Sequence, residues 1–121
     1  MFFCRHIHFF PIIDVETRTV FAQEALARGL NGEGAAEVFK HVNETNLYRF
    51  DQSCRVKAIR LAAELNVDSF LNINFLPNAI YRPELCIRTT LAAAETYAFD
   101  KTKIIFEFTE NERIVDQKHL I

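Results

Sequence analysis

The spacing of apolar side chains divides the chain into strands and helices. Phe3 to Ile13 and Thr19 to Arg28 are rich in β-favouring residues and flank the polar stretch Asp14 to Arg18, which predicts an antiparallel pair of strands. The glycine-rich segment Gly29 to Gly34 then predicts a loop that leads into a short helix over about 35–42.

A longer helix is predicted in the middle of the chain. Its apolar residues recur at spacings of three and four: Phe50, Cys54, Ala58, Leu61 and Leu65. A helix over about 50–65 would bury this stripe, including Cys54 as a small core side chain. Three basic residues lie between the stripe positions and are expected to face solvent: Arg55, Lys57 and Arg60.

The second half of the chain alternates strand and helix. From Ser69 to Phe75 apolar residues recur at every second position, which predicts a strand that ends before Pro77. Pro83 suits the first turn of a helix over 83–97, and Lys103 to Phe108 predicts the next strand, followed by a helix over 111–121. Strands separated by helices indicate an α/β fold with a parallel sheet after the initial hairpin.

Composition narrows the class of protein. A chain of 121 residues with 50% hydrophobic residues has enough surface to bury for one core but not for two. Its net charge of −2, without a basic run, argues against a nucleic-acid partner, and its apolar runs are shorter than the ~20 residues of a membrane span. The three cysteines are widely spaced and the start lacks a signal peptide, so we expect reduced thiols in the cytoplasm.

Strand parity brings polar side chains to one side of the sheet. Leu71, Ile73 and Phe75 share one face, and so do Ile104, Phe106 and Phe108, which leaves Asn74 and Glu107 on the opposite side. Glu24 has the corresponding parity in the second strand. Carboxylate and amide oxygens without thiolate or imidazole are the ligands of hard ions such as Mg²⁺, Mn²⁺ or Ca²⁺. The simpler alternative is isolated polar residues at strand ends that face water.

These positions resemble a known family in their order and spacing. The matching residues are Glu24-Ala25-Leu26, Arg28, Asn74 within 71–77, Glu107 and Glu110, with Pro11 to Asp14 and the helical segment 91–95 in support. This set is similar to the EAL domain of cyclic di-GMP phosphodiesterases, from about Phe9 to Leu120. Tyr48 to Asp51 and the segment 76–81 are similar to EAL domains that follow blue-light-sensing flavin domains.

The resemblance implies a TIM-barrel variant whose first strand is antiparallel. It also implies two divalent ions, Mg²⁺ or Mn²⁺, that hydrolyse one phosphodiester of cyclic di-GMP to the linear dinucleotide. Glu24, Asn74 and Glu107 match metal ligands of the family. Arg28 matches an arginine that contacts the substrate phosphate, and Glu110 a glutamate that supports a loop beside the metals.

The chain also departs from the family pattern. Phe10 stands where the family has a guanine-reading glutamine, so we expect weaker guanine selectivity. The family's aspartate pair, lysine and catalytic glutamate have no counterpart within 1–121. We therefore expect this chain to be the N-terminal part of one EAL domain, with about four strands of the barrel. We also expect it to be inactive alone and to self-associate through an open sheet edge. The alternative is a non-catalytic EAL-like module that signals by binding.

Overall fold

The computed structural model describes residues 6–29, 31–34, 37–38, 40–43, 45–75 and 83–108. The elements in chain order are β1 (His6–Asp14), β2 (Thr19–Arg28), α2 (Leu47–Glu64), β3 (Phe70–Phe75), α3 (Pro83–Thr96), the short 3-10 helix η2 (Lys101–Lys103) and β4 (Ile104–Phe108). The strands and the two long helices predicted from the sequence are therefore confirmed. The predicted stop at Pro77 and the helix over 111–121 lie outside the described residues. In the short helix predicted over 35–42, residues 35, 36 and 39 also lie outside them, whereas Glu37 and Val38 are helical and 40–41 form a turn.

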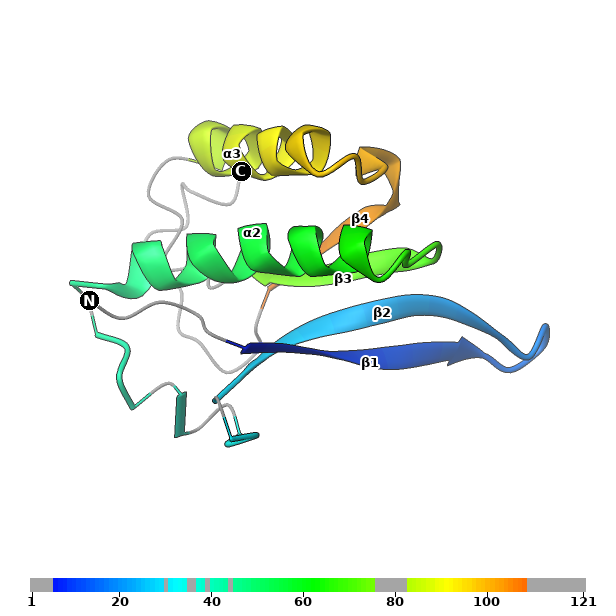
Figure 1. Cartoon of the computed structure of the whole chain (residues 1–121), viewed down its shortest axis with the longest axis horizontal. Coiled ribbons are helices and arrows are strands. Elements are labelled where there is room, and N and C mark those ends of the chain that lie inside the picture. Colours follow the sequence, from blue (N-terminus) through cyan, green and yellow to red (C-terminus); the bar gives the residue numbers. More distant parts are fainter. Residues whose placement is uncertain are drawn as a thin grey trace.

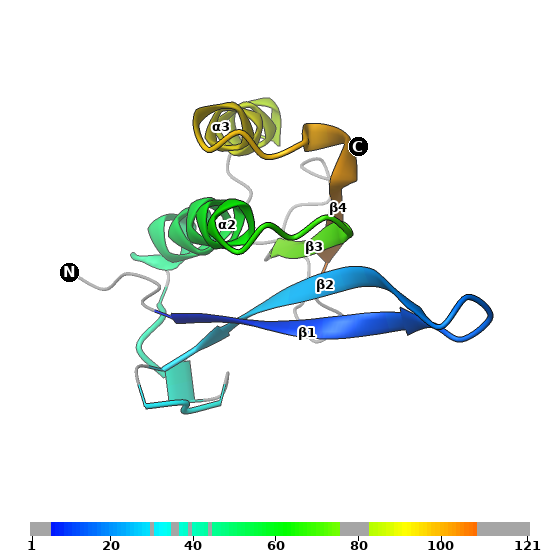
Figure 2. The same ribbon diagram turned by 45° about the vertical axis from the view of Figure 1, so that its right-hand side comes forward.

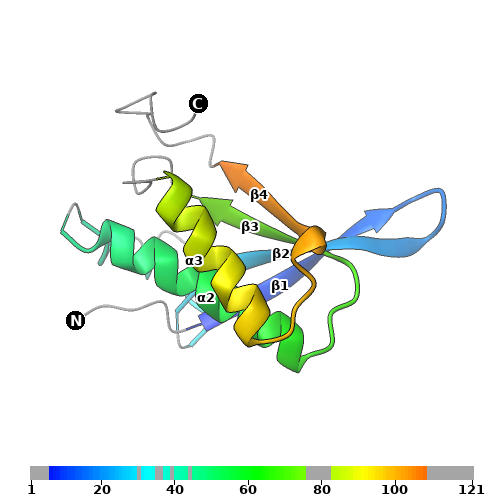
Figure 3. The same cartoon turned by 90° about the horizontal axis from the view of Figure 1, so that it is seen from above.

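The strands form one sheet in the order β1-β2-β3-β4. β1 pairs antiparallel with β2, whereas β2, β3 and β4 are parallel to one another. In Figure 3, β3 and β4 run side by side in the same direction, and the turn between β1 and β2 projects beyond the opposite end of the sheet. The carboxyl ends of β2, β3 and β4 thus meet at the edge of the sheet away from this turn.

Both long helices cover the same face of the sheet (Figures 1 and 2). The core between the helices and the sheet contains Phe50, Ala58, Ile59 and Ala62 from α2, and Leu71 and Ile73 from β3. Leu71 and Ile73 are both nearly inaccessible, which confirms that this parity of β3 faces the helices. A helix that buries one stripe against a sheet gains most of its stability from this packing rather than from its own hydrogen bonds.

The expected apolar stripe of α2 is correct at Phe50 and Ala58 but wrong at its end. Leu65 is 64% exposed, because the helix ends at Glu64 and Leu65 serves as its C-cap. Ile59 and Ala62 take part in the buried face instead, and Cys54 and Leu61 pack at its border. The buried face is therefore centred about one residue further along the helix than the predicted stripe.

Arg55 was expected to face solvent, but it lies on the buried side of α2. Its side chain is 1% exposed, and Asp51 one turn earlier is also buried. Arg55 Nη1 donates a hydrogen bond to Asp51 Oδ2, and Arg55 Nε donates to Thr90 Oγ1 of α3 at 3.2 Å. A buried charge needs such partners, so this polar bridge fixes α2 against α3 within an otherwise apolar layer.

The sheet face opposite the helices is less covered. A partial barrel predicts that Phe10 and Ala22 on this face both contact water. Phe10 is 43% exposed, but Ala22 is fully buried, so the prediction is wrong for Ala22. Its methyl group lies in register between Ile12 of β1 and Phe70 of β3, and such directly opposed neighbours are close enough to cover it.

Within the described residues, no helix is long and apolar enough to cross a membrane.

The bridge between α2 and α3 generates a stability prediction. Replacing Asp51 with alanine leaves the Arg55 guanidinium buried without its carboxylate, and we expect the free energy of unfolding to fall by about 3–5 kcal/mol in urea denaturation. Glu64→Ala is the matched control, because Glu64 pairs with Arg60 at 3.7 Å on the exposed side of the same helix. Its loss should be below about 1 kcal/mol. Equal losses in the two variants would contradict the assignment of the bridge as a structural link.

Candidate functional site

Strand register assembles a polar row across the face of the sheet opposite the helices. Phe10 of β1 pairs with Glu24 of β2, Glu24 pairs with Asn72 of β3, and Asn72 pairs with Ile105 of β4. One step nearer the carboxyl ends of the strands, Asn74 pairs with Glu107. Because residues in register share a face, the side chains of both rows project to the same side.

The carboxyl groups of Glu24 and Glu107 lie within mutual reach although they belong to strands that are separated by β3. Burial raises the pKa of Glu24 above its ordinary value, and a hydrogen bond that protonated Glu24 donates to Glu107, together with the negative charge of Glu107, raises this pKa further. The positive charge of Arg28 acts in the opposite direction but is the smallest contribution. Two carboxylates this close cannot both ionise without cost unless a proton or a cation lies between them.

Asn72 is the polar residue that sequence reasoning passed over. Its Nδ2 group donates a hydrogen bond to Glu107 Oε1, and the residue is only 6% exposed. Asn72 has the parity of Asn74 and therefore lies on the same face of the sheet. The resemblance to the family matches Asn74 and not Asn72, so Asn72 was not among the predicted ligands. Its register with Glu24 is the signal that would have identified it.

Of the predicted site residues Asn74 and Glu110, the structure describes only Asn74. Asn74 is half-buried and lies in register beside Glu107, so the sheet brings the backbone positions of the predicted ligands together as expected. The contacts of Glu107 that the structure records are with Asn72 and Glu24. Glu110 lies outside the described residues.

Arg28 and Phe10 form the flank of the site on the side of β1. The Arg28 guanidinium carbon lies 5.3 Å from the centre of the Phe10 ring, a cation–π arrangement. Arg28 Nη1 also donates a hydrogen bond to the carbonyl oxygen of Ala27 at 2.7 Å. The ring is therefore in contact with the arginine that the resemblance assigns to substrate phosphate.

The donor set suits a hard divalent cation. Glu24 and Glu107 supply carboxylate oxygens, and Asn72 and Asn74 are neutral amides on the same face. Among the residues that the structure describes, no group of three or more His, Cys, Asp and Glu side chains is arranged to hold a metal. Two carboxylates with amide oxygens are a donor set that Mg²⁺ and Mn²⁺ accept, so these four residues could hold such an ion.

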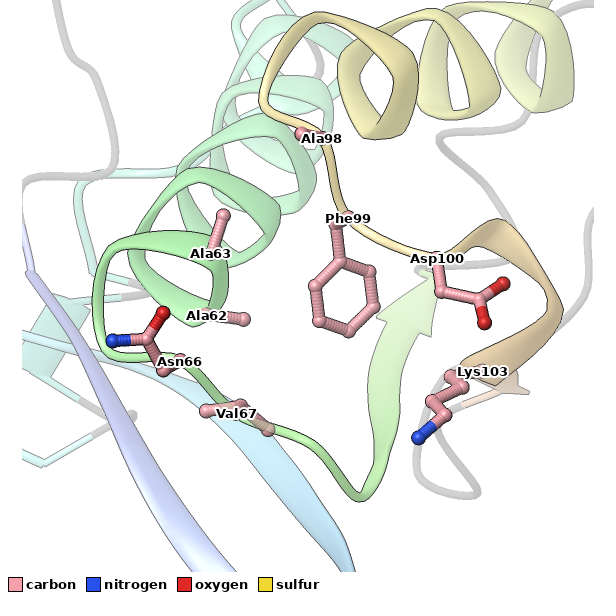
Figure 4. A pocket seen from close by; sticks show the side chains of 8 residues that line it. All are labelled: Ala62, Ala63, Asn66, Val67, Ala98, Phe99, Asp100 and Lys103. Atoms are coloured by element: carbon pink, nitrogen blue, oxygen red, sulfur yellow. The ribbon is translucent and has the colours of Figure 1, made fainter.

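A pocket of about 310 Å³ lies at the other end of the sheet. Figure 4 shows Phe99 directed into the space between the end of α2 and the start of β3, with Asp100 and Lys103 at the rim. Asp100 is occupied in capping η2, where it accepts hydrogen bonds from the backbone N–H and the hydroxyl of Thr102 at 2.9 and 2.6 Å. This pocket contains none of the residues of the polar rows.

Comparison with known proteins assigns the fold and the motif to one family. The sequence profile of the EAL domain matches residues 5–121. The chain belongs to the EAL domain family. It is 27% identical over 110 residues to the blue light- and temperature-regulated antirepressor BluF of Escherichia coli K12, a match that covers 90% of this chain and 27% of that protein.

Solved structures show the same architecture. A standalone versatile EAL protein from Vibrio cholerae O395, in its c-di-GMP-bound form, is 58% identical with a TM-score of 0.85; the match covers 94% of this chain and 48% of that one. Klebsiella pneumoniae BlrP1, in a manganese and cyclic di-GMP complex, has a TM-score of 0.83 at 24% identity and covers 94% of this chain and 29% of its own. The chain thus spans about half, or less, of the proteins that it matches.

The crowding of Glu24 and Glu107 generates a prediction about pH. Because the pKa of Glu24 is raised in the folded state, the unfolded chain loses this proton first as the pH rises above about 4.5. The resulting loss of stability is complete above the folded pKa. In the absence of divalent metal, Glu24→Gln should therefore raise the melting temperature at pH 7–8 by roughly 2–5 °C, and the gain should vanish near pH 4. Calorimetric melting at several pH values checks this, and a gain independent of pH would contradict it.

Proposed function

We propose that this chain is the N-terminal part of an EAL-type cyclic di-GMP phosphodiesterase domain. The observation that supports the proposal most strongly is that the carboxyl groups of Glu24 and Glu107 lie close together on one face of the sheet. Asn72 donates a hydrogen bond to Glu107 and so fixes its side chain. Family membership and the similarity to EAL structures with bound cyclic di-GMP support the substrate. Chemistry that depends on two hard cations would explain why two carboxylates remain adjacent in a half-buried place.

The proposed roles follow the resemblance and the geometry. Glu24, Asn74 and Glu107 hold the cations, which are Mg²⁺ or Mn²⁺. When bound, two such ions supply an activated water and neutralise the charge that develops during in-line displacement at phosphorus. Arg28 contacts the substrate phosphate, and Glu110 supports a neighbouring loop. The catalytic aspartates, lysine and glutamate of the complete domain come from outside residues 1–121.

Phe10 offers a base an apolar ring in place of the glutamine amide that is usual in the family. Its exposed ring has no hydrogen-bonding group, and Arg28 already lies against one of its sides. A base that contacts this ring is bound by stacking, which every purine permits. We therefore propose that Phe10 binds the substrate with weaker selection for guanine than the glutamine usual in the family.

The metal ligands provide the direct test of the proposed function. In the protein that contains the complete domain, Glu24→Ala or Glu107→Ala should lower turnover of cyclic di-GMP to the linear dinucleotide by at least about 100-fold, because each change removes a ligand of a catalytic cation. Glu16→Ala is the control, since Glu16 lies exposed in the β1–β2 turn. Near-normal turnover in Glu107→Ala would remove the metal-dependent mechanism. The non-catalytic alternative is favoured if all three variants bind cyclic di-GMP and none hydrolyses it.

We also propose that residues 1–121, purified alone, self-associate and do not hydrolyse cyclic di-GMP. β4 is the last strand of the described sheet, so one row of its N–H and C=O groups has no neighbouring strand there. Apolar side chains near the β1–β2 turn are also exposed, including Ile13, Val20 and Phe21 at 42–51%. A second copy can cover such surface, but it repeats Glu24 and Glu107 without supplying the missing aspartates.

Light scattering and a product assay check both parts of this proposal. We expect a mass of at least two chains at micromolar concentration, and no linear dinucleotide in Mg²⁺ or Mn²⁺ above the level of the Glu24→Ala variant. A stable monomer would contradict the first part. Metal-dependent turnover that Glu24→Ala abolishes would contradict the second.

A further inference from the structure

Asn72 is a buried amide with one half of its hydrogen-bonding capacity unused. Its Nδ2 group donates to Glu107, whereas its Oδ1 has no accessible surface and no hydrogen-bond partner among the described residues. Buried polar atoms in folded proteins are nearly always paired, because an unpaired one loses water without compensation. A missing donor at Oδ1 therefore indicates a group that binds at this place.

The surroundings of Asn72 fix the direction of its amide. The side chain lies in register with Glu24 and binds Glu107, so carboxylates approach it from both neighbouring strands. An ionised carboxylate only accepts hydrogen bonds, so the NH₂ group has to face Glu107 and the carbonyl oxygen has to point elsewhere. The unpaired atom is thus the oxygen on chemical grounds.

A hydrated divalent cation has the chemistry that this oxygen lacks. Mg²⁺ keeps several of its waters when carboxylates bind it, and each of these waters donates hydrogen bonds. Glu24 and Glu107 supply the negative charge on the same face of the sheet. One amide beside both carboxylates can orient one of them and at the same time contact the hydration shell of the ion.

We propose that Asn72 is a positioning residue of the cation site. Its Nδ2–H group fixes the Glu107 carboxylate, and its Oδ1 accepts a hydrogen bond from a water of the cation that Glu24 and Glu107 hold. This inference rests on the proposed function, since it assumes the cation. It adds to the ligands Glu24, Asn74 and Glu107 a residue that acts on the ion through Glu107 and through water.

The test measures Mn²⁺ binding by the full-length protein without nucleotide, from the electron paramagnetic resonance signal of free Mn²⁺. Asn72→Leu keeps the approximate shape but removes both polar groups, and it should raise the dissociation constant for Mn²⁺ at least about 10-fold, as loss of groups that orient ligands does elsewhere. Asn72→Ser retains a group that both donates and accepts and should recover part of the affinity. Thr90→Val is the control, because Thr90 is an equally buried polar residue on the helical side of the sheet.

The expected result is weaker Mn²⁺ binding in Asn72→Leu, partial recovery in Asn72→Ser, and a change of less than about 2-fold in Thr90→Val, whatever its loss of stability. Where Asn72→Leu does not fold, Asn72→Ala replaces it, and the comparison with Asn72→Ser decides. Equal affinities of the wild type and the Asn72 variants would overturn the inference and leave the proposed function standing. A wild type that binds no Mn²⁺ would overturn both.

Discussion

The repulsion between Glu24 and Glu107 is the interaction around which the polar face of the sheet is arranged. Two carboxyl groups from strands that are not neighbours approach each other across β3, in a place where burial already disfavours charge. Each nearby feature reduces this cost in part. Asn72 donates to Glu107, and Arg28 lowers the pKa of Glu24. The remaining electrostatic cost is one that a positive charge placed between the two carboxyl groups would lower.

The helical side supplies the rigidity that such an arrangement needs. α2 leads into β3 and α3 leads towards β4, so an error in the packing of these helices displaces the strands that carry Asn72 and Glu107. The bridge of Asp51, Arg55 and Thr90 gives α2 and α3 a directional contact, whereas the surrounding alanines permit sliding. Hydrogen bonds of fixed geometry thus define the helix positions more closely than apolar contacts alone.

Some features of the fold and of the polar face could be predicted from the sequence, and others could not. The strands and long helices were predictable because the alternation in 70–75 and Pro83 each act locally. Arg55 was not, because its burial depends on Thr90, 35 residues away, and a charge on a helix is ordinarily solvated. Parity alone assigned Glu24, Asn74 and Glu107 to one face. The contact of Asn72 with Glu107 depends on register between strands, which a single sequence does not contain.

The reversed direction of β1 changes which end of the chain lies near the site. In a sheet of parallel strands, the chain enters each strand at the end remote from the carboxyl-terminal edge. Here His6, the first residue of β1, is paired with Arg28, the last residue of β2, and Phe10 lies beside Glu24. The start of β1 therefore lies beside the carboxyl end of β2, and only four positions along the chain separate His6 from Phe10. The side of the polar face that Phe10 and Arg28 form is thus connected to the start of the strand by extended backbone alone, with no helix between them.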